Sequence, residues 1–303
     1  MGEKVLMKGN EAIGEAAIRS GCRHFFGYPI TPQTELSAYM AKKMPKINGV
    51  FLQAESEVSA INMVYGAAAA GMRTMTSSSS PGISLKAEGI SYLAAGDLPC
   101  VIVNIVRGGP GLGGIQPAQS DYFQAVKGGG HGDYHLIVLA PNSVQELAHL
   151  TAEAFNISDE YRIPTMILGD GTLGQMMEPV DLDAIPEPIY ADKPWAARGT
   201  DNKRKKNVVE TLYLEASELE KKVLEREEKY NVVKENLQRY EAHDIDDADI
   251  IISSYGITSR VVETAVKSLR EEGIKVGVIR PITLWPFPEK IFKTVKPKAF
   301  LSV

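Results

Sequence analysis

The chain has 303 residues, and its 33 Lys and Arg against 38 Asp and Glu give a formal net charge of −5. This charge disfavours a nucleic-acid partner, and the sequence holds neither an apolar run of about 20 residues nor a basic-then-apolar leader, so we expect no membrane partner and a cytoplasmic location. Two distant cysteines, Cys22 and Cys100, exclude a disulfide scaffold, a cysteine-rich zinc site and a four-cysteine iron–sulfur cluster within this chain.

Residues 1–178 alternate helical and extended patterns. Hydrophobic periodicity predicts helices over 11–19, 34–43, 55–71, 82–95 and 144–157, and strands over 23–27, 49–52, 73–76, 99–106, 135–139 and 164–168. The run Val101-Ile102-Val103 is typical of strands that are buried on both faces. We therefore expect an α/β domain over residues 1–178, in which a parallel sheet carries helices on both faces.

Residues 179–245 are predicted to form a linker and an amphipathic helix. Four prolines between positions 179 and 194, and a basic run at 203–206, interrupt regular structure. One charged helix is predicted from Val208 to Tyr240. Its apolar stripe consists of Leu219, Val223, Tyr230, Val233, Leu237 and Tyr240. The stripe suits a helix docked on this chain or, alternatively, a coiled-coil seam with a partner.

A smaller α/β domain is predicted over residues 246–303. The pattern gives strands over 249–253, 274–279 and 298–303, a helix over 259–272, and a loop at 280–288 that leads into a short helix. Doubly wound domains rarely end on a bare strand, so we expect a truncated C-terminus.

Five polar or glycine-rich segments each follow a predicted strand. They span residues 28–32, 53–57, 77–82, 107–114 and 169–171. Ligands of open parallel sheets bind beyond the carboxyl ends of the strands, so these five segments are predicted to lie on one rim and to hold the site.

Two kinds of charged residue in these segments suggest a catalytic or ligand-binding role. Glu55 and Glu57 open a helix, where acidic residues stabilise the helix dipole; alternatively, one carboxyl turns into an apolar pocket and exchanges a proton. Arg107 ends a very apolar strand, and a buried guanidinium needs an anion. That anion is either an internal carboxylate or a carboxylate or phosphate of a ligand.

Other motifs identify no reaction. The segment 109–114 does not match GxGxxG, which disfavours an NAD-dependent dehydrogenase. Gly169-Asp170-Gly171 lacks the following Asn of a thiamine-diphosphate motif and is interpreted as a structural turn. His131 has no partner at a diagnostic spacing, and a non-catalytic ligand-binding protein stays possible from the residues alone.

The order of several segments resembles the alpha subunit of 2-oxoacid:ferredoxin oxidoreductases, of the branched-chain (2-oxoisovalerate) or 2-oxoglutarate type. The similar segments are residues 7–12, 28–32, 53–57, 66–71, 80–85, 130–135 and 280–288. The resemblance implies a domain like the pyrimidine-binding domain of thiamine-diphosphate enzymes, followed by a domain like the transketolase C-terminal domain. The serine segment departs from the family at Ser80, so Ser77 to Ser80 receive no role.

The resemblance also implies coenzyme-A-dependent oxidative decarboxylation of a 2-oxoacid, with electrons passed to ferredoxin. Thiamine diphosphate would be shared with a beta subunit. Magnesium and the iron–sulfur clusters would lie on that beta subunit and on a ferredoxin-like subunit, so that activity requires these partners.

Three residues match functional positions of the family. Glu57, rather than Glu55, matches the glutamate that contacts the aminopyrimidine of thiamine diphosphate and takes part in its proton chemistry. Thr31 matches a hydroxyl that contacts the substrate, and Arg107 matches the contact for the substrate carboxylate.

Overall fold

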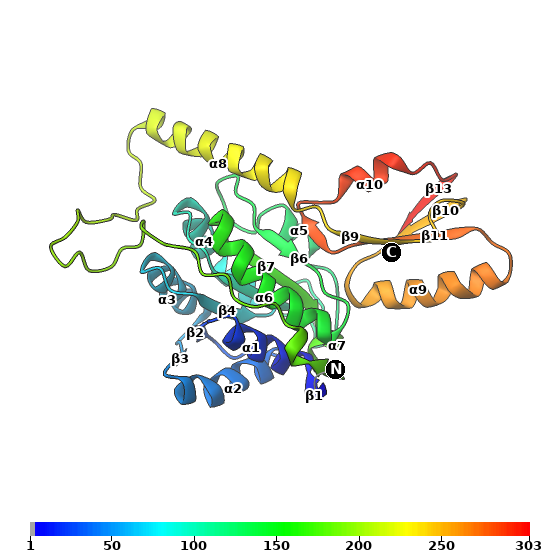
Figure 1. The fold of residues 1–303 in the computed structure, drawn as a ribbon, viewed down its shortest axis with the longest axis horizontal. Coiled ribbons are helices and arrows are strands. Elements are labelled where there is room, and N and C mark those ends of the chain that lie inside the picture. The colour runs from blue at the N-terminus through cyan, green and yellow to red at the C-terminus, as the bar shows by residue number, and fades with distance from the viewer. Residues whose placement is uncertain (1–3) are drawn as a thin grey trace.

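The computed structural model describes residues 4–303 and contains two main sheets (Figure 1). The larger sheet has seven strands in the order β12-β6-β7-β5-β4-β2-β3. Its members are β2 (His24–Gly27), β3 (Val50–Gln53), β4 (Thr74–Ser78), β5 (Val101–Val106), β6 (Ile137–Leu139), β7 (Thr165–Asp170) and β12 (Thr283–Trp285). All neighbours pair in parallel except β12, which runs antiparallel to β6. This confirms the expected α/β fold.

Five main helices cover this sheet. The main helices are α1 (Gly9–Arg19), α2 (Thr34–Lys43), α3 (Glu57–Ala69), α4 (Pro81–Ala95) and α6 (Val144–Tyr161). Helix α1 packs on α2 and on α6, and α3 packs on α4. Short helices α5 (Tyr122–Val126) and α7 (Gly171–Gln175), which the sequence analysis did not predict, follow β5 and β7.

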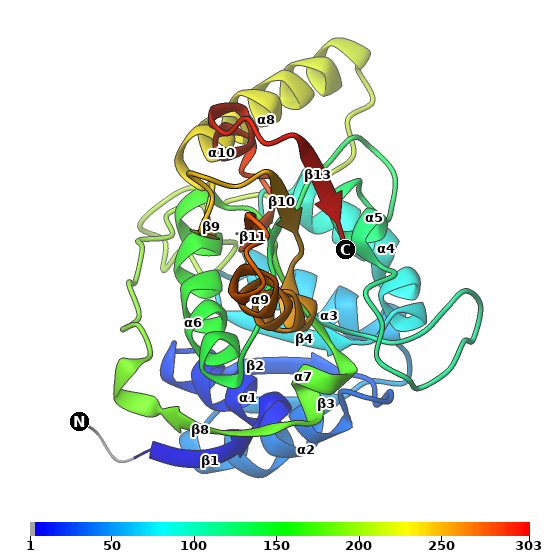
Figure 2. The ribbon, with the colours of Figure 1, turned by 90° about the vertical axis from the view of Figure 1, so that its right-hand side faces the viewer.

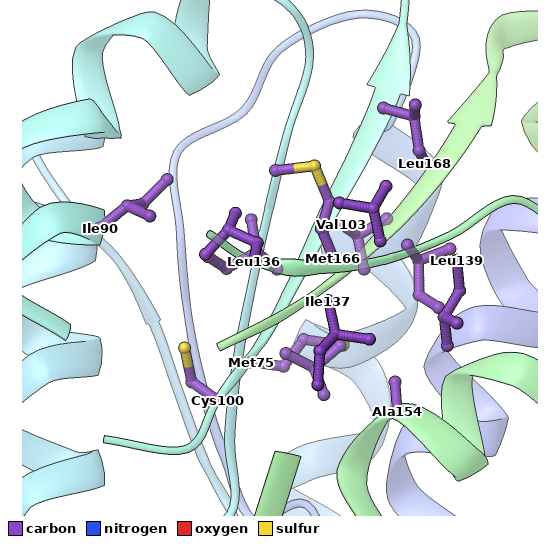
Figure 3. Packing of buried hydrophobic residues seen from close by; sticks show 14 of the residues in the cluster. Met75, Ile90, Cys100, Val103, Leu136, Ile137, Leu139, Ala154, Met166 and Leu168 are labelled. Carbon is purple, nitrogen blue, oxygen red and sulfur yellow. The ribbon is translucent and has the colours of Figure 1, made fainter. Parts of the chain in front are cut away.

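Every residue of β5 is buried, and five of its six residues are apolar. Figure 3 shows Met75, Val103, Ile137 and Met166, one from each of the four strands β4, β5, β6 and β7, together with Ala154 of α6. These side chains are at most 2% exposed. Their exclusion from water is the main favourable term for this layer.

The smaller sheet has the order β13-β10-β11-β9, and Figure 1 shows it flanked by α9 and α10. Its elements are β9 (Tyr240–His243), β10 (Ile250–Ser253), β11 (Val276–Pro281), β13 (Ala299–Ser302), α9 (Gly256–Glu271) and α10 (Glu289–Thr294). In Figure 2, α9 lies in front of the larger sheet's end. The domain boundaries expected at residues 178 and 246 are not tested by the sheet arrangement and stay predictions.

Residues 283–285, expected as loop, form β12 and join the larger sheet. Trp285 is 7% exposed and stacks on His135, with ring centroids 4.7 Å apart. Tyr230 packs edge-on against both rings. Burial of this aromatic cluster holds the C-terminal part of the chain against the first sheet. No local sequence pattern predicts the cluster, because its rings come from distant parts of the chain.

The antiparallel pair β1 (Lys4–Lys8) and β8 (Met177–Asp181) was likewise not expected from the sequence.

The predicted helix over 208–240 is too long at both ends. Helix α8 runs from Ala216 to Asn236, and residues 240–243 instead form β9, paired with β11. Only the second half of the apolar stripe docks: Tyr230, Val233 and Leu237 are at most 6% exposed. Residues 208–214 form no helix. Alternate residues of this segment are partly buried, among them Val209, which packs against the core, but none is buried as deeply as Tyr230. Figure 1 shows this part of the chain leading up to the first turn of α8.

A buried ion pair holds the linker that follows β8. Arg73 Nε lies 2.8 Å from Asp159 Oδ2, and both side chains are 4% exposed. Lys193 Nζ lies 2.6 Å from the other oxygen of the same carboxylate. Arg73 also donates to the Ile189 carbonyl at 2.5 Å. The carboxylate thus joins α6 to Lys193 of the linker, and Arg73 joins the same cluster to Ile189.

Asp159→Asn is expected to lower the free energy of unfolding by about 3 kcal/mol, because it leaves Arg73 and Lys193 buried beside a neutral amide. Urea titration followed by circular dichroism measures this loss. Asp192→Asn, which changes an exposed carboxylate of the same segment, is the matched control and should have little effect. Equal stability of the two variants would contradict the anchoring role of Asp159.

No helix within residues 4–303 is long and apolar enough to span a bilayer.

Candidate functional site

The carboxyl ends of the parallel strands meet at one edge of the larger sheet, and the segments expected there are joined by hydrogen bonds. The Ser77 hydroxyl donates to Gln33 Oε1 at 2.6 Å, which links the ends of β4 and β2. The Ser80 hydroxyl donates to the Arg107 carbonyl at 3.2 Å, which links β4 to β5. The predicted rim is therefore a continuous structure.

Arg107 is 7% exposed and is held only by backbone carbonyls. Its guanidinium donates to Thr31 O at 3.0 Å and to Leu112 O at 3.1 Å, while its buried Nε has no hydrogen-bond partner. Within residues 4–303, no carboxylate lies within 4.0 Å of this guanidinium. The internal ion pair weighed from the sequence is therefore not found in this part of the chain, and the cation can bind an external anion.

Thr31 lies beside Arg107 in the turn between β2 and α2. The turn is fixed by the fully buried Gln33, whose Nε2 donates to the Tyr28 carbonyl at 3.2 Å and whose Oε1 accepts from Ser77. Thr31 itself is exposed. The structure thus brings together two residues that are 76 positions apart in sequence.

The two candidate glutamates differ in burial. Glu57 is the first residue of α3 and is 6% exposed, whereas Glu55 is exposed. The intervening Ser56 caps the helix by accepting from the Ser59 amide at 3.2 Å. Ser56 thus accepts from one of the free amides at the start of the helix, so the Glu57 carboxyl is not needed as the cap. The Glu57 side chain is buried instead.

Glu57 lies directly against the N-terminus of α4. A Cβ atom at Gly82 would lie 2.9 Å from Glu57 Oε1 and 2.0 Å from Ser78 Oγ, so only glycine permits this approach. The hydroxyls of Ser78 and Ser79 are buried without hydrogen-bond partners. A carboxylate accepts hydrogen bonds, and a free hydroxyl can donate one. Together they can bind a heterocyclic ligand whose ring carries both donor and acceptor nitrogens.

Ser80 supports Arg107 in a way the sequence analysis did not anticipate. Its hydroxyl accepts from the Arg107 amide at 3.1 Å, and its own amide donates to Asn104 Oδ1 at 3.1 Å. Its φ of 29° lies in the left-handed region, a conformation that costs free energy and that is common at functional sites. The available sequence signal for this role was the run of four serines from Ser77 to Ser80, the first two of which end β4.

Lys86 is a second residue that the sequence analysis missed. It is fully buried in α4, and its ammonium donates to Thr76 Oγ1 at 2.7 Å and to the Ser77 carbonyl at 3.2 Å. Burial lowers the pKa of Lys86 to about 7, against the upward influence of the negative charge of Glu57. The signal was a lysine in a helix that is otherwise small and apolar on that face.

The structure also places two further motifs of the sequence. Asp170 caps α7 by accepting from the amides of Thr172 at 2.7 Å and Leu173 at 3.1 Å, which confirms the structural turn. His131 lies exposed in the loop before β6. Within residues 4–303, no three His, Cys, Asp or Glu side chains are grouped so that they could hold a metal ion.

Comparisons with known proteins agree with one another. Residues 15–256 match the profile of the thiamine-diphosphate-binding part of pyruvate flavodoxin/ferredoxin oxidoreductase, and residues 248–302 match core domain II of pyruvate:ferredoxin oxidoreductase. The chain is 52% identical to the ketoisovalerate oxidoreductase subunit VorB of Methanothermobacter marburgensis, over 94% of this chain and 81% of that one. It is 37% identical to the 2-oxoglutarate synthase subunit KorA of Methanocaldococcus jannaschii, over 96% and 86%.

A solved structure is similar over nearly the whole chain. The 2-oxoglutarate:ferredoxin oxidoreductase of Magnetococcus marinus, with 2-oxoglutarate, coenzyme A and succinyl-CoA bound, matches with a TM-score of 0.89 at 30% identity. The match covers 99% of this chain and 58% of that one. A split-gene transketolase at 14% identity and a TM-score of 0.58 shares the fold.

Proposed function

The chain belongs to the 2-oxoacid:ferredoxin oxidoreductase family, and on that premise we propose that it is an alpha-type subunit whose Glu57, Thr31 and Arg107 form part of a thiamine-diphosphate site. A beta subunit completes this site and holds the diphosphate and magnesium. Iron–sulfur clusters reside on the beta and ferredoxin-like subunits. The observation that carries the proposal is the buried Arg107 guanidinium beside Thr31, held by carbonyls and free of any carboxylate within residues 4–303.

In this proposal each residue has one task. Arg107 binds the carboxylate of the 2-oxoacid through a charge-assisted contact and so orients it. Thr31, placed beside Arg107, contacts the substrate from the adjoining turn. Glu57 holds a proton at a ring nitrogen of the aminopyrimidine, where its burial beside Gly82 keeps water away from the carboxyl. When bound, thiamine diphosphate supplies the electron sink for the loss of carbon dioxide.

The substrate proposed is 2-oxoisovalerate, which the complete complex converts to an acyl-coenzyme A and carbon dioxide. The support is sequence identity: the chain is 52% identical to the ketoisovalerate oxidoreductase subunit and 37% identical to the 2-oxoglutarate synthase subunit. 2-Oxoglutarate is the alternative substrate.

Coexpression with partner subunits tests this proposal. The purified complex is expected to contain thiamine diphosphate and iron, and to reduce a dye with a kcat/KM about tenfold or more higher for 2-oxoisovalerate than for 2-oxoglutarate. The isolated chain should be inactive. A complex that reduces no dye with any 2-oxoacid would contradict the proposal, and a preference for 2-oxoglutarate would overturn only the substrate.

A further inference from the structure

A glycine-rich loop carries Arg107 and folds back on it. This Arg107 loop spans residues 107–118, directly after β5, and holds five glycines. At its base the Gly108 amide donates to the Gln116 carbonyl at 2.8 Å. At its tip the Leu112 carbonyl accepts from the Arg107 guanidinium at 3.1 Å. The position of the loop therefore decides where the guanidinium is held.

The Arg107 loop has little packing of its own. Residues 109–117 are all exposed, and the side chain of Leu112 at the tip is 82% exposed. Gly111 and Gly113 have φ angles of 72° and 62°, in the left-handed region that glycine enters without strain. A segment with few buried contacts opens at little cost in free energy. The guanidinium is therefore held in one place only if the loop is anchored at its ends.

Gln119 anchors the end of the Arg107 loop to the start of α9. Its Nε2 donates to the Tyr255 carbonyl at 2.8 Å, and its Oε1 accepts from the Thr258 hydroxyl at 2.8 Å. The main-chain carbonyl of Gln119 also accepts from the Tyr255 hydroxyl, at 3.1 Å. Gln119 lies two residues after Pro117, which forms a β-bridge with Arg107 itself. Three hydrogen bonds at the start of α9 therefore hold the chain close to the base of this loop.

The start of α9 is shaped to receive Gln119. Gly256, the first residue of α9, has a φ of 59°, and a Cβ atom there would lie 2.9 Å from Gln119 Nε2. The left-handed φ and the close approach both favour glycine at this position. Helix α9 follows β10 of the smaller sheet, whereas the Arg107 loop follows β5 of the larger one. The contact therefore ties the two sheets together beside the Arg107 loop.

We propose that Gln119 is a positioning residue for the substrate carboxylate. By fixing the Arg107 loop to α9, it keeps the Arg107 guanidinium where the 2-oxoacid binds. This role rests on the proposed function, because it needs Arg107 at the substrate. Gln119 acts without touching the substrate, since a displacement of about 1 Å in a positioned group is enough to cost about 100-fold in rate.

Gln119→Met in the assembled complex tests this role. Methionine keeps the length of the side chain but makes neither side-chain hydrogen bond, while Asp121, held by Asn104 at 3.0 Å, keeps the following segment in place. Two probes that cannot lose carbon dioxide are measured as competitive inhibitors of dye reduction. They are the 2-hydroxy analogue of the preferred 2-oxoacid and the uncharged methyl ester of that analogue. The preference for acid over ester, taken as the ratio of the two inhibition constants, is expected to fall about tenfold, because a displaced guanidinium no longer meets the carboxylate.

Two comparisons separate positioning from a general loss of structure. Gln145→Met removes a glutamine of α6 that likewise makes two main-chain hydrogen bonds, with Asp181 at 3.2 and 2.7 Å, and it should leave the preference unchanged. In an Arg107→Met background, Gln119→Met should cause no further fall, because the group that it positions is gone. An unchanged preference in Gln119→Met, an equal fall in Gln145→Met, or a further fall in the Arg107→Met background would each overturn the role of Gln119.

Hydrogen exchange over residues 108–116 of the assembled complex gives a readout that does not depend on catalysis. The Gly108 amide and the Gly114 amide, which donates to the Gly108 carbonyl at 2.9 Å, are both hydrogen-bonded inside the loop. Gln119→Met should speed the exchange of these amides several-fold, because the loop opens more often. Exchange at the wild-type rate shows that the loop does not depend on Gln119 and overturns the inference.

If Gln119→Met does not assemble, Thr258→Val makes the change from the α9 side. It removes the 2.8 Å hydrogen bond to Gln119 Oε1 without altering the loop, and it should lower the preference for the acid by about threefold. A wild-type complex that binds acid and ester equally overturns the proposed role of Arg107 and this inference together. A wild-type preference that both variants keep overturns the inference alone.

Discussion

Glu57→Gln is expected to lower kcat of the assembled complex by about 100- to 10,000-fold, the usual range for loss of an acid–base group. Glutamine keeps the size of the side chain and can still form hydrogen bonds, but it cannot hold or release the proton. The buried position of Glu57 against Gly82 leaves little room for water to substitute. Dye reduction that depends on a 2-oxoacid and coenzyme A measures the loss.

Glu55→Gln is the matched control for this experiment. It makes the same chemical change two residues away, at an exposed position of the same segment, and should leave kcat within about twofold of wild type. Unchanged dye reduction in Glu57→Gln, or an equal loss in both variants, would remove Glu57 from the proposed site.

Arg107→Met is expected to lower kcat/KM for the 2-oxoacid by about 100-fold, mostly through KM. Hydrogen bonds to charged groups are worth about 1.5–3 kcal/mol each, and every 1.4 kcal/mol corresponds to a factor of ten. The side chain has no carboxylate within 4.0 Å among residues 4–303, so the loss reports on the substrate more than on an internal partner. Steady-state kinetics with increasing 2-oxoacid measures the change.

An uncharged ester of the same 2-oxoacid provides the control for Arg107. The ester cannot lose carbon dioxide, so it is measured as a competitive inhibitor, and acid and ester are compared by binding. Wild type should prefer the acid over the ester, and Arg107→Met should lose that preference while its affinity for thiamine diphosphate stays unchanged. If the variant still discriminates acid from ester as strongly as wild type, the substrate carboxylate is bound elsewhere.

Periodicity and strand composition predicted the larger sheet well, because these signals are local. The run at β5 is apolar at five of its six positions, and the structure buries all six on both faces of the parallel sheet. The position of the rim followed from the same observation, since parallel strands end at one edge. The ends of α8 could not be predicted in this way. The helix is held by the burial of Tyr230 and Val233 against residues that are distant in sequence.

The sequence by itself determined the fold class, the edge at which the proposed site lies and, through its resemblance to a family, the candidates Thr31, Glu57 and Arg107. Only the tertiary structure decided that Glu57 is buried while Glu55 is exposed, and that Arg107 meets carbonyls rather than a carboxylate within residues 4–303. It alone revealed that Lys86 is fully buried and donates to Thr76 and Ser77. The physical reason is that periodicity reports which face of an element is apolar, whereas burial and charge pairing depend on residues brought together from distant parts of the chain.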